Sequence, residues 1–142
     1  MKRFISMALV PSLTLTLFAV AGCGKKEDQP KGKVYFSEPK DGAEVKSPVK
    51  IVMNLEGMKL QPAGEVVEGT GHHHLLINND SMPAGQVIPT DDTHKHFGKG
   101  QTETELELPP GDYKLTLQFA DGLHRSYGPE LSATIAIKVV AN

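Results

Sequence analysis

The chain has 142 residues with 14 glycines, 10 prolines and no tryptophan, a composition that suits one turn-rich β domain better than a helical bundle. Its 17 acidic residues outnumber its 15 basic residues. This balance argues against nucleic acid or anionic lipid as a partner, because both require a basic patch.

The first 22 residues have the pattern of an export signal. Met1-Lys-Arg3 is positively charged, and the segment from Phe4 to Val20 is apolar apart from Pro11 and a few Ser and Thr. A membrane-spanning helix, which needs about 20 apolar residues, is the alternative. Val20-Ala-Gly-Cys23 resembles the lipobox of bacterial lipoproteins. That resemblance implies cleavage before Cys23 and lipidation of Cys23. The alternative is that Cys23 is a free thiol or forms an intermolecular disulfide.

A lipid on Cys23 would anchor the mature chain in a membrane of the cell envelope. Gly24 resembles the residue at this position in lipoproteins that are forwarded to the outer membrane, so we expect the domain to face the periplasm from there. Residues 23–32 are rich in charged residues, Gln and Pro, which predicts a flexible tether. Loss of Lys2 and Arg3 leaves 13 basic residues against 17 acidic ones.

Residues 33–142 predict one β domain. Alternation of apolar and polar side chains, bounded by Gly, Pro and Asp turns, predicts seven short strands. They lie near residues 34–36, 49–55, 72–77, 86–88, 101–108, 113–119 and 135–139. The acidic alternation at Glu103, Glu105 and Glu107 predicts a solvated strand face that blocks edge pairing.

Seven short strands without crossover helices predict an all-β fold, an immunoglobulin-like antiparallel β-sandwich, with a small barrel as the alternative. The stretch Leu108-Pro-Pro-Gly-Asp-Tyr113 favours the sandwich, because a tyrosine that follows a tight turn there resembles the tyrosine corner of such folds. The Cys, Trp, Cys pattern of antibody domains is absent from the sequence. We therefore expect burial of the core alone to stabilise the domain.

The six histidines lie in three segments, at 72–74, at 94 and 96, and at 124. In a strand, His72 and His74 share one face, while His73 shares the other face with Leu75. The second-to-third, fourth-to-fifth and sixth-to-seventh connections of such a sandwich gather at one end. Because these connections carry the three segments, we expect the histidines to converge.

Converging imidazoles predict a transition-metal site, since neutral imidazole binds Zn, Cu, Ni and Fe well. The predicted ligands of a copper or zinc ion are His72, His74, His94, His96 and His124, with Asp91, Asp92 and Met58 available to complete the shell. His73 is expected to be a hydrogen-bonded core residue. The alternative is that the histidines stabilise Gly-rich loops through hydrogen bonds without an ion.

No hydrolase, phosphate-binding or metalloprotease motif is present in the sequence, so we expect no enzyme. The main hypothesis is a lipid-anchored envelope protein that binds copper or zinc. The alternative is a non-catalytic module whose loops recognise a protein, peptide or glycan, with structural histidines. Phe97 and Tyr127 are the aromatic residues on these loops that a glycan would stack on.

Four motifs resemble the bacterial family known as domain of unknown function 4399. They are Gly69-Thr-Gly-His-His-His-Leu-Leu-Ile-Asn78, His94-Lys-His-Phe-Gly-Lys-Gly-Gln-Thr102, Leu108-Pro-Pro-Gly-Asp-Tyr113 and Ala120-Asp-Gly-Leu-His124. The resemblance covers about Phe36 to Val140 and implies a small exported protein with no assigned activity. Asn78 and Tyr113 stand where Asp and His are common in the family, and neither difference affects the histidines.

Overall fold

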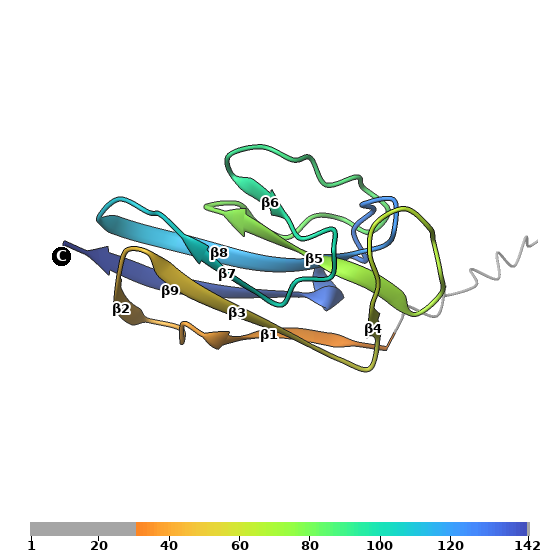
Figure 1. The fold of residues 1–142 in the computed structure, drawn as a ribbon, viewed down its shortest axis with the longest axis horizontal. Helices are drawn as coiled ribbons and strands as arrows, with labels where there is room; N and C mark the ends of the chain where they lie inside the picture. Colours follow the sequence, from red (N-terminus) through yellow and green to blue (C-terminus); the bar gives the residue numbers. More distant parts are fainter. Residues whose placement is uncertain (1–30, 142) are drawn as a thin grey trace, which may run out of the picture.

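The computed structural model describes residues 31–141, which form nine strands and one short 3-10 helix (Figure 1). The strands are β1 (Lys33–Glu38), β2 (Ala43–Lys46), β3 (Val49–Glu56), β4 (Lys59–Leu60), β5 (Thr70–Ile77), β6 (His94–His96), β7 (Glu103–Leu106), β8 (Gly111–Ala120) and β9 (Ser132–Val140). The helix η1 spans Pro129–Leu131. The predicted signal sequence, the lipobox and Cys23 lie outside the described residues. Within residues 31–141, no helix is long and apolar enough to span a bilayer.

The strands form two packed sheets, as an immunoglobulin-like sandwich requires. One sheet has the order β1-β3-β7, and the other has the order β2-β9-β8-β5-β4, with β6 also paired to β5. The chain leaves the first sheet after β1 and joins the second as β2, which runs parallel to β9. The pairs β1–β3, β3–β7, β5–β8 and β8–β9 are antiparallel. This order confirms the predicted all-β sandwich.

The core lies between the two sheets and is built from alternate residues of each strand. Val49, Ile51 and Met53 of β3 face Leu115, Leu117 and Phe119 of β8, and all six are buried. At the start of β8, the hydroxyl of Tyr113 donates a hydrogen bond to the carbonyl oxygen of Pro109 at 2.9 Å. This contact is the predicted tyrosine corner.

The strands differ from the prediction at four places. Residues 86–88 form an isolated bridge instead of a strand, because Pro83 and Pro89 flank a segment whose Val87 is exposed. Residues 94–96, predicted as a loop, form β6 against β5. Residues 43–46 and 59–60, for which no strand was predicted, form β2 and β4. The acidic strand β7 does lie at a sheet edge, as its alternating glutamates predicted.

Candidate metal centre

Strand β5 places His72 and His74 on the outer face of the six-stranded sheet. Leu75 and Ile77 belong to the sandwich core, and His72 and His74 alternate with them, as the sequence predicted. Both histidines are fully buried, with 0% exposure. The entrance of this strand therefore does not face solvent.

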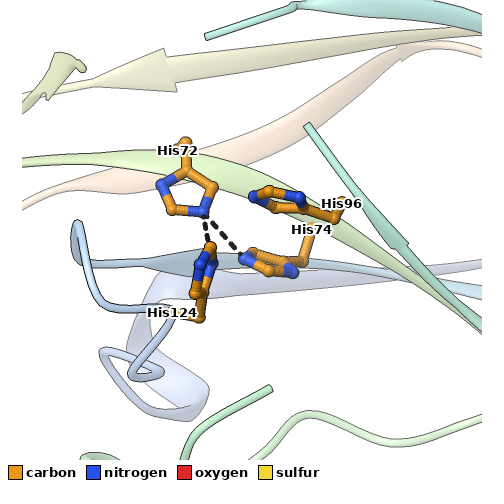
Figure 2. A group of neighbouring side chains, drawn as sticks. All are labelled: His72, His74, His96 and His124. Carbon is orange, nitrogen blue, oxygen red and sulfur yellow. Dashed lines mark hydrogen bonds between the residues drawn. The ribbon is translucent and has the colours of Figure 1, made fainter. Parts of the chain in front are cut away.

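Two further histidines reach the same place from other elements (Figure 2). His96 of β6 lies opposite His74 in the antiparallel ladder, and their ring centroids are 5.1 Å apart. His124 comes from the loop between β8 and β9, and its ring centroid is 5.1 Å from that of His72 and 4.6 Å from that of His96. The four-histidine cluster, His72, His74, His96 and His124, thus joins three segments that are distant in the sequence.

Gly98 makes room for the imidazole of His96. A Cβ atom on residue 98 would lie 2.2 Å from Cε1 and 2.3 Å from Nε2 of that ring. Because ordinary carbon contacts are about 3.5–4.0 Å, any larger side chain would displace the ring. The sequence alone does not indicate this role, because nothing in the local pattern distinguishes Gly98 from a turn glycine.

Asp121 shapes the loop that carries His124. Its Oδ1 accepts hydrogen bonds from the backbone N–H groups of Leu123 at 2.9 Å and Arg125 at 3.0 Å. Its Oδ2 accepts one from Nε of Arg125 at 2.8 Å. The turn holds His124 at a φ of 64°, a left-handed conformation that residues other than glycine rarely adopt. Asp121-Gly122 is an ordinary turn signal. The sequence therefore predicts a turn here, but it does not indicate that the turn positions His124.

The ring nitrogens of the cluster converge on one point (Figure 2). Nε2 of His72 lies 3.0 Å from Nε2 of His74 and 3.2 Å from Nδ1 of His124. One ligand nitrogen from each of the four histidines lies within 4.8 Å of all the others. Two nitrogens bound tetrahedrally to one ion at about 2.0 Å would be separated by about 3.3 Å. The cluster could therefore hold a metal ion.

Hydrogen bonds among the rings do not account for this arrangement. An imidazole nitrogen carries either one proton or one lone pair, so Nε2 of His72 can bond well to only one of the two nitrogens that it faces. Nδ1 of His72, Nδ1 of His74 and Nε2 of His96 are buried without a hydrogen-bond partner among the described residues. Lone pairs directed at one shared cation would relieve the contact between the nitrogens.

Burial keeps three histidines of the cluster, His72, His74 and His96, neutral. Desolvation, followed by the charges of His96 and His124, lowers the pKa of His72 to about 4. Desolvation and the neighbouring histidines lower the pKa of His74 to about 2. Desolvation also lowers the pKa of His96. At pH 7 these three imidazoles are uncharged, which is the form that binds metals.

The structure brings together four of the five histidines that the sequence proposed as ligands, and His94 is not among them. Its Nδ1 lies 2.9 Å from Oδ1 of Asp91, in the turn before β6. Asp91 therefore pairs with His94 instead of completing the cluster, and Asp92 is exposed. Met58 packs against the hydrophobic core.

His73 points into the sandwich core, as predicted. Its ring centroid lies 5.4 Å from that of Phe119, and its side chain is fully buried. Neither ring nitrogen has a hydrogen-bond partner within the described part of the chain, so the expectation of a hydrogen-bonded core histidine is wrong. Desolvation and the charge of His72 lower the pKa of His73 to about 4.

Fold and site together define an immunoglobulin-like sandwich protein with a partly buried four-histidine cluster. Residues 51–140 match the family described as a domain of unknown function (DUF4399), and the chain belongs to this family. The matched range contains all four histidines of the cluster.

No curated protein matches the chain significantly. Among solved structures, the chain is similar to an endo-beta-1,4-mannanase from Thermotoga petrophila, with 18% sequence identity and a TM-score of 0.46. The similarity covers 83% of this chain and 22% of the mannanase chain. This chain therefore spans a minor part of the mannanase, and a likeness of this degree carries no argument about function.

Proposed function

We propose that this protein is a lipid-anchored, non-catalytic protein of the bacterial cell envelope that binds a transition metal ion, copper or zinc, through the four-histidine cluster. The observation that carries the proposal is the convergence of four imidazole nitrogens within 4.8 Å of one another. Imidazole is a good ligand for both metals. Neutral rings at pH 7 leave lone pairs free for an ion.

The burial of the histidines supports metal binding over a recognition surface. A module that recognises a protein, peptide or glycan with its loops needs accessible side chains, whereas His72 and His74 have no exposed surface. Phe97 is buried in the core, and the ring of Tyr127 stacks on Phe119 while its hydroxyl donates to the carbonyl oxygen of Thr70 at 2.7 Å. Neither aromatic ring is freely presented to a glycan.

The unpaired ring nitrogens also weigh against purely structural histidines. A histidine that stabilises a loop does so by hydrogen bonding, and buried polar atoms in folded proteins are nearly always paired. Three ring nitrogens of the cluster, Nδ1 of His72, Nδ1 of His74 and Nε2 of His96, are buried without a partner within the described residues. A loop-stabilising role would require hydrogen bonds from these nitrogens. A bound ion would instead use the lone pairs of the nitrogens that face one another, such as Nε2 of His72 and Nε2 of His74.

The metal proposal is tested by titration of the full chain, purified in detergent without a histidine tag, with Cu(I), Cu(II) and Zn(II). We expect one ion per chain, and we expect His72→Ala and His74→Ala each to weaken binding at least tenfold. His94→Ala is the matched control, because His94 lies on β6 beside the cluster but bonds to Asp91, and it should bind as the wild type does. Equal, weak binding by the wild type and His74→Ala would contradict the proposal.

The anchor proposal rests on Val20-Ala-Gly-Cys23, and its test is independent of the metal. Cells grown with labelled palmitate should label the wild-type chain and leave the Cys23→Ser chain unlabelled, because serine lacks the thiol that accepts the lipid. The wild-type protein should fractionate with the outer membrane. Label on the serine variant would show that Cys23 is not the lipidation site.

A further inference from the structure

The donor set of the cluster contains no negative charge. The group that could hold an ion consists of four histidines, and within the described residues no carboxylate or thiolate belongs to it. Neutral imidazoles share electron pairs with an ion but do not offset its charge. The site with its ion would therefore keep the full charge of that ion.

The surroundings of the cluster do not offset this charge either. Asp121 is a buried carboxylate at the start of the loop that carries His124. Its Oδ2 lies 2.8 Å from the Arg125 guanidinium, which offsets its charge. His72 and His74 are fully buried, whereas His96 and His124 are partly exposed, so solvent reaches the cluster from the side of these two residues only. The charge of a bound ion would therefore be offset by no charge of the donor set, and solvent would screen it from one side only.

The free energy of transferring an ion from water into a buried site rises with the square of its charge. The desolvation free energy of a divalent ion is therefore about four times that of a monovalent ion of similar size. Among the metals that imidazole binds well, copper is the one with a common monovalent state. We propose that this site binds Cu(I) in preference to Zn(II) and Cu(II). This inference rests on the proposed metal-binding function.

The test compares the three ions on the untagged full chain in detergent. Cu(I) affinity is measured without oxygen by competition with the Cu(I) chelator bicinchoninate, and Zn(II) and Cu(II) affinities by calorimetry with competing chelators. We expect Cu(I) to bind at least about 100-fold more tightly than either divalent ion. Equal or tighter binding of Zn(II) or Cu(II) would overturn the inference and leave the metal-binding function in place. Binding of none of the three would overturn both.

A pair of variants isolates the role of charge. His96→Asp places a carboxylate in the cluster, and His96→Asn places a neutral group of nearly the same shape there. His96 is partly exposed, so the fold should tolerate both changes. Relative to His96→Asn, we expect His96→Asp to shift the ratio of Zn(II) affinity to Cu(I) affinity at least tenfold towards Zn(II). An unchanged ratio would show that the charge of the donor set does not select the ion.

Discussion

Replacement of Gly98 by alanine should remove His96 from the cluster without removing the histidine from the chain. The new Cβ atom would lie 2.2 Å from Cε1 of His96. To restore a contact of about 3.5 Å, the ring must move by about 1.3 Å. Metal–nitrogen distances tolerate changes of about 0.2 Å, so such a displacement takes the ring nitrogen out of binding range. The structure therefore predicts that Gly98→Ala behaves as a ligand deletion.

We expect Gly98→Ala to lower the affinity for the bound metal by at least about tenfold, as His96→Ala does. The backbone of Gly98 does not need a left-handed conformation, and His96 is partly exposed and free to swing outward. The free energy of unfolding of the metal-free protein should therefore fall by no more than the about 1–3 kcal/mol typical of overpacking. Metal titration and urea unfolding measure the two quantities separately.

A double-mutant cycle gives this prediction its control. If Gly98 acts by making room for the ring of His96, then Gly98→Ala should not weaken binding further in a His96→Ala background. Two outcomes would refute the reasoning. One is unchanged metal affinity in Gly98→Ala, and the other is an additive loss in the double variant, which would mean that Gly98 acts through the loop backbone.

Three further predictions follow from the same geometry. The pKa values of His72, His73 and His74 lie below 6.5 in the folded chain, so the unfolded chain binds more protons as the pH falls from about 6.5 to about 4. The free energy of unfolding of the metal-free protein should be highest above pH 6.5. As the pH falls below 6.5, it should decline by up to about 1.4 kcal/mol per pH unit for each histidine. A free energy of unfolding in urea that stays constant down to pH 5 would refute this prediction. Asp121→Ala should lower metal affinity about 10–100-fold because it frees the histidine loop, while Asp121→Asn, which keeps an acceptor oxygen, should lose less; equal titrations would contradict this. Tyr113→Phe should lower the free energy of unfolding by about 1 kcal/mol and leave metal affinity unchanged, so a change in affinity would count against a purely structural corner.

The sequence predicted the sandwich and the division of β5 into two faces because both depend on a local two-residue period. That period separates His72 and His74 from His73, and the structure has the same separation. The convergence of the histidine segments was predicted by counting connections between strands. The count contained an error at residues 86–88, yet the histidines still meet, because β6 pairs directly with β5.

What the sequence could not supply is register and close packing. The spacing of His94 and His96 suggests that both act together, but the ladder sets His96 opposite His74 and His94 opposite Leu76. Register between strands depends on tertiary pairing, which no local pattern encodes. The role of Gly98 depends on a contact with a ring that only the folded chain brings near.

The unpaired polar atoms of this fold gather where its histidines are. Five buried ring nitrogens of the described chain lack hydrogen-bond partners, and each such atom costs about 1–3 kcal/mol, in a domain whose net stability is typically about 5–15 kcal/mol. The same strand continues as Leu75, Leu76 and Ile77, so apolar side chains are accommodated on both of its faces. Stability alone would favour more of them, since apolar residues commonly replace buried polar groups without loss. An ion that binds only the folded chain stabilises it, by about 4 kcal/mol at a concentration 1,000 times its Kd. The proposed metal binding would therefore offset the cost of placing His72, His74, His96 and His124 in the cluster, whereas His73 lies outside it.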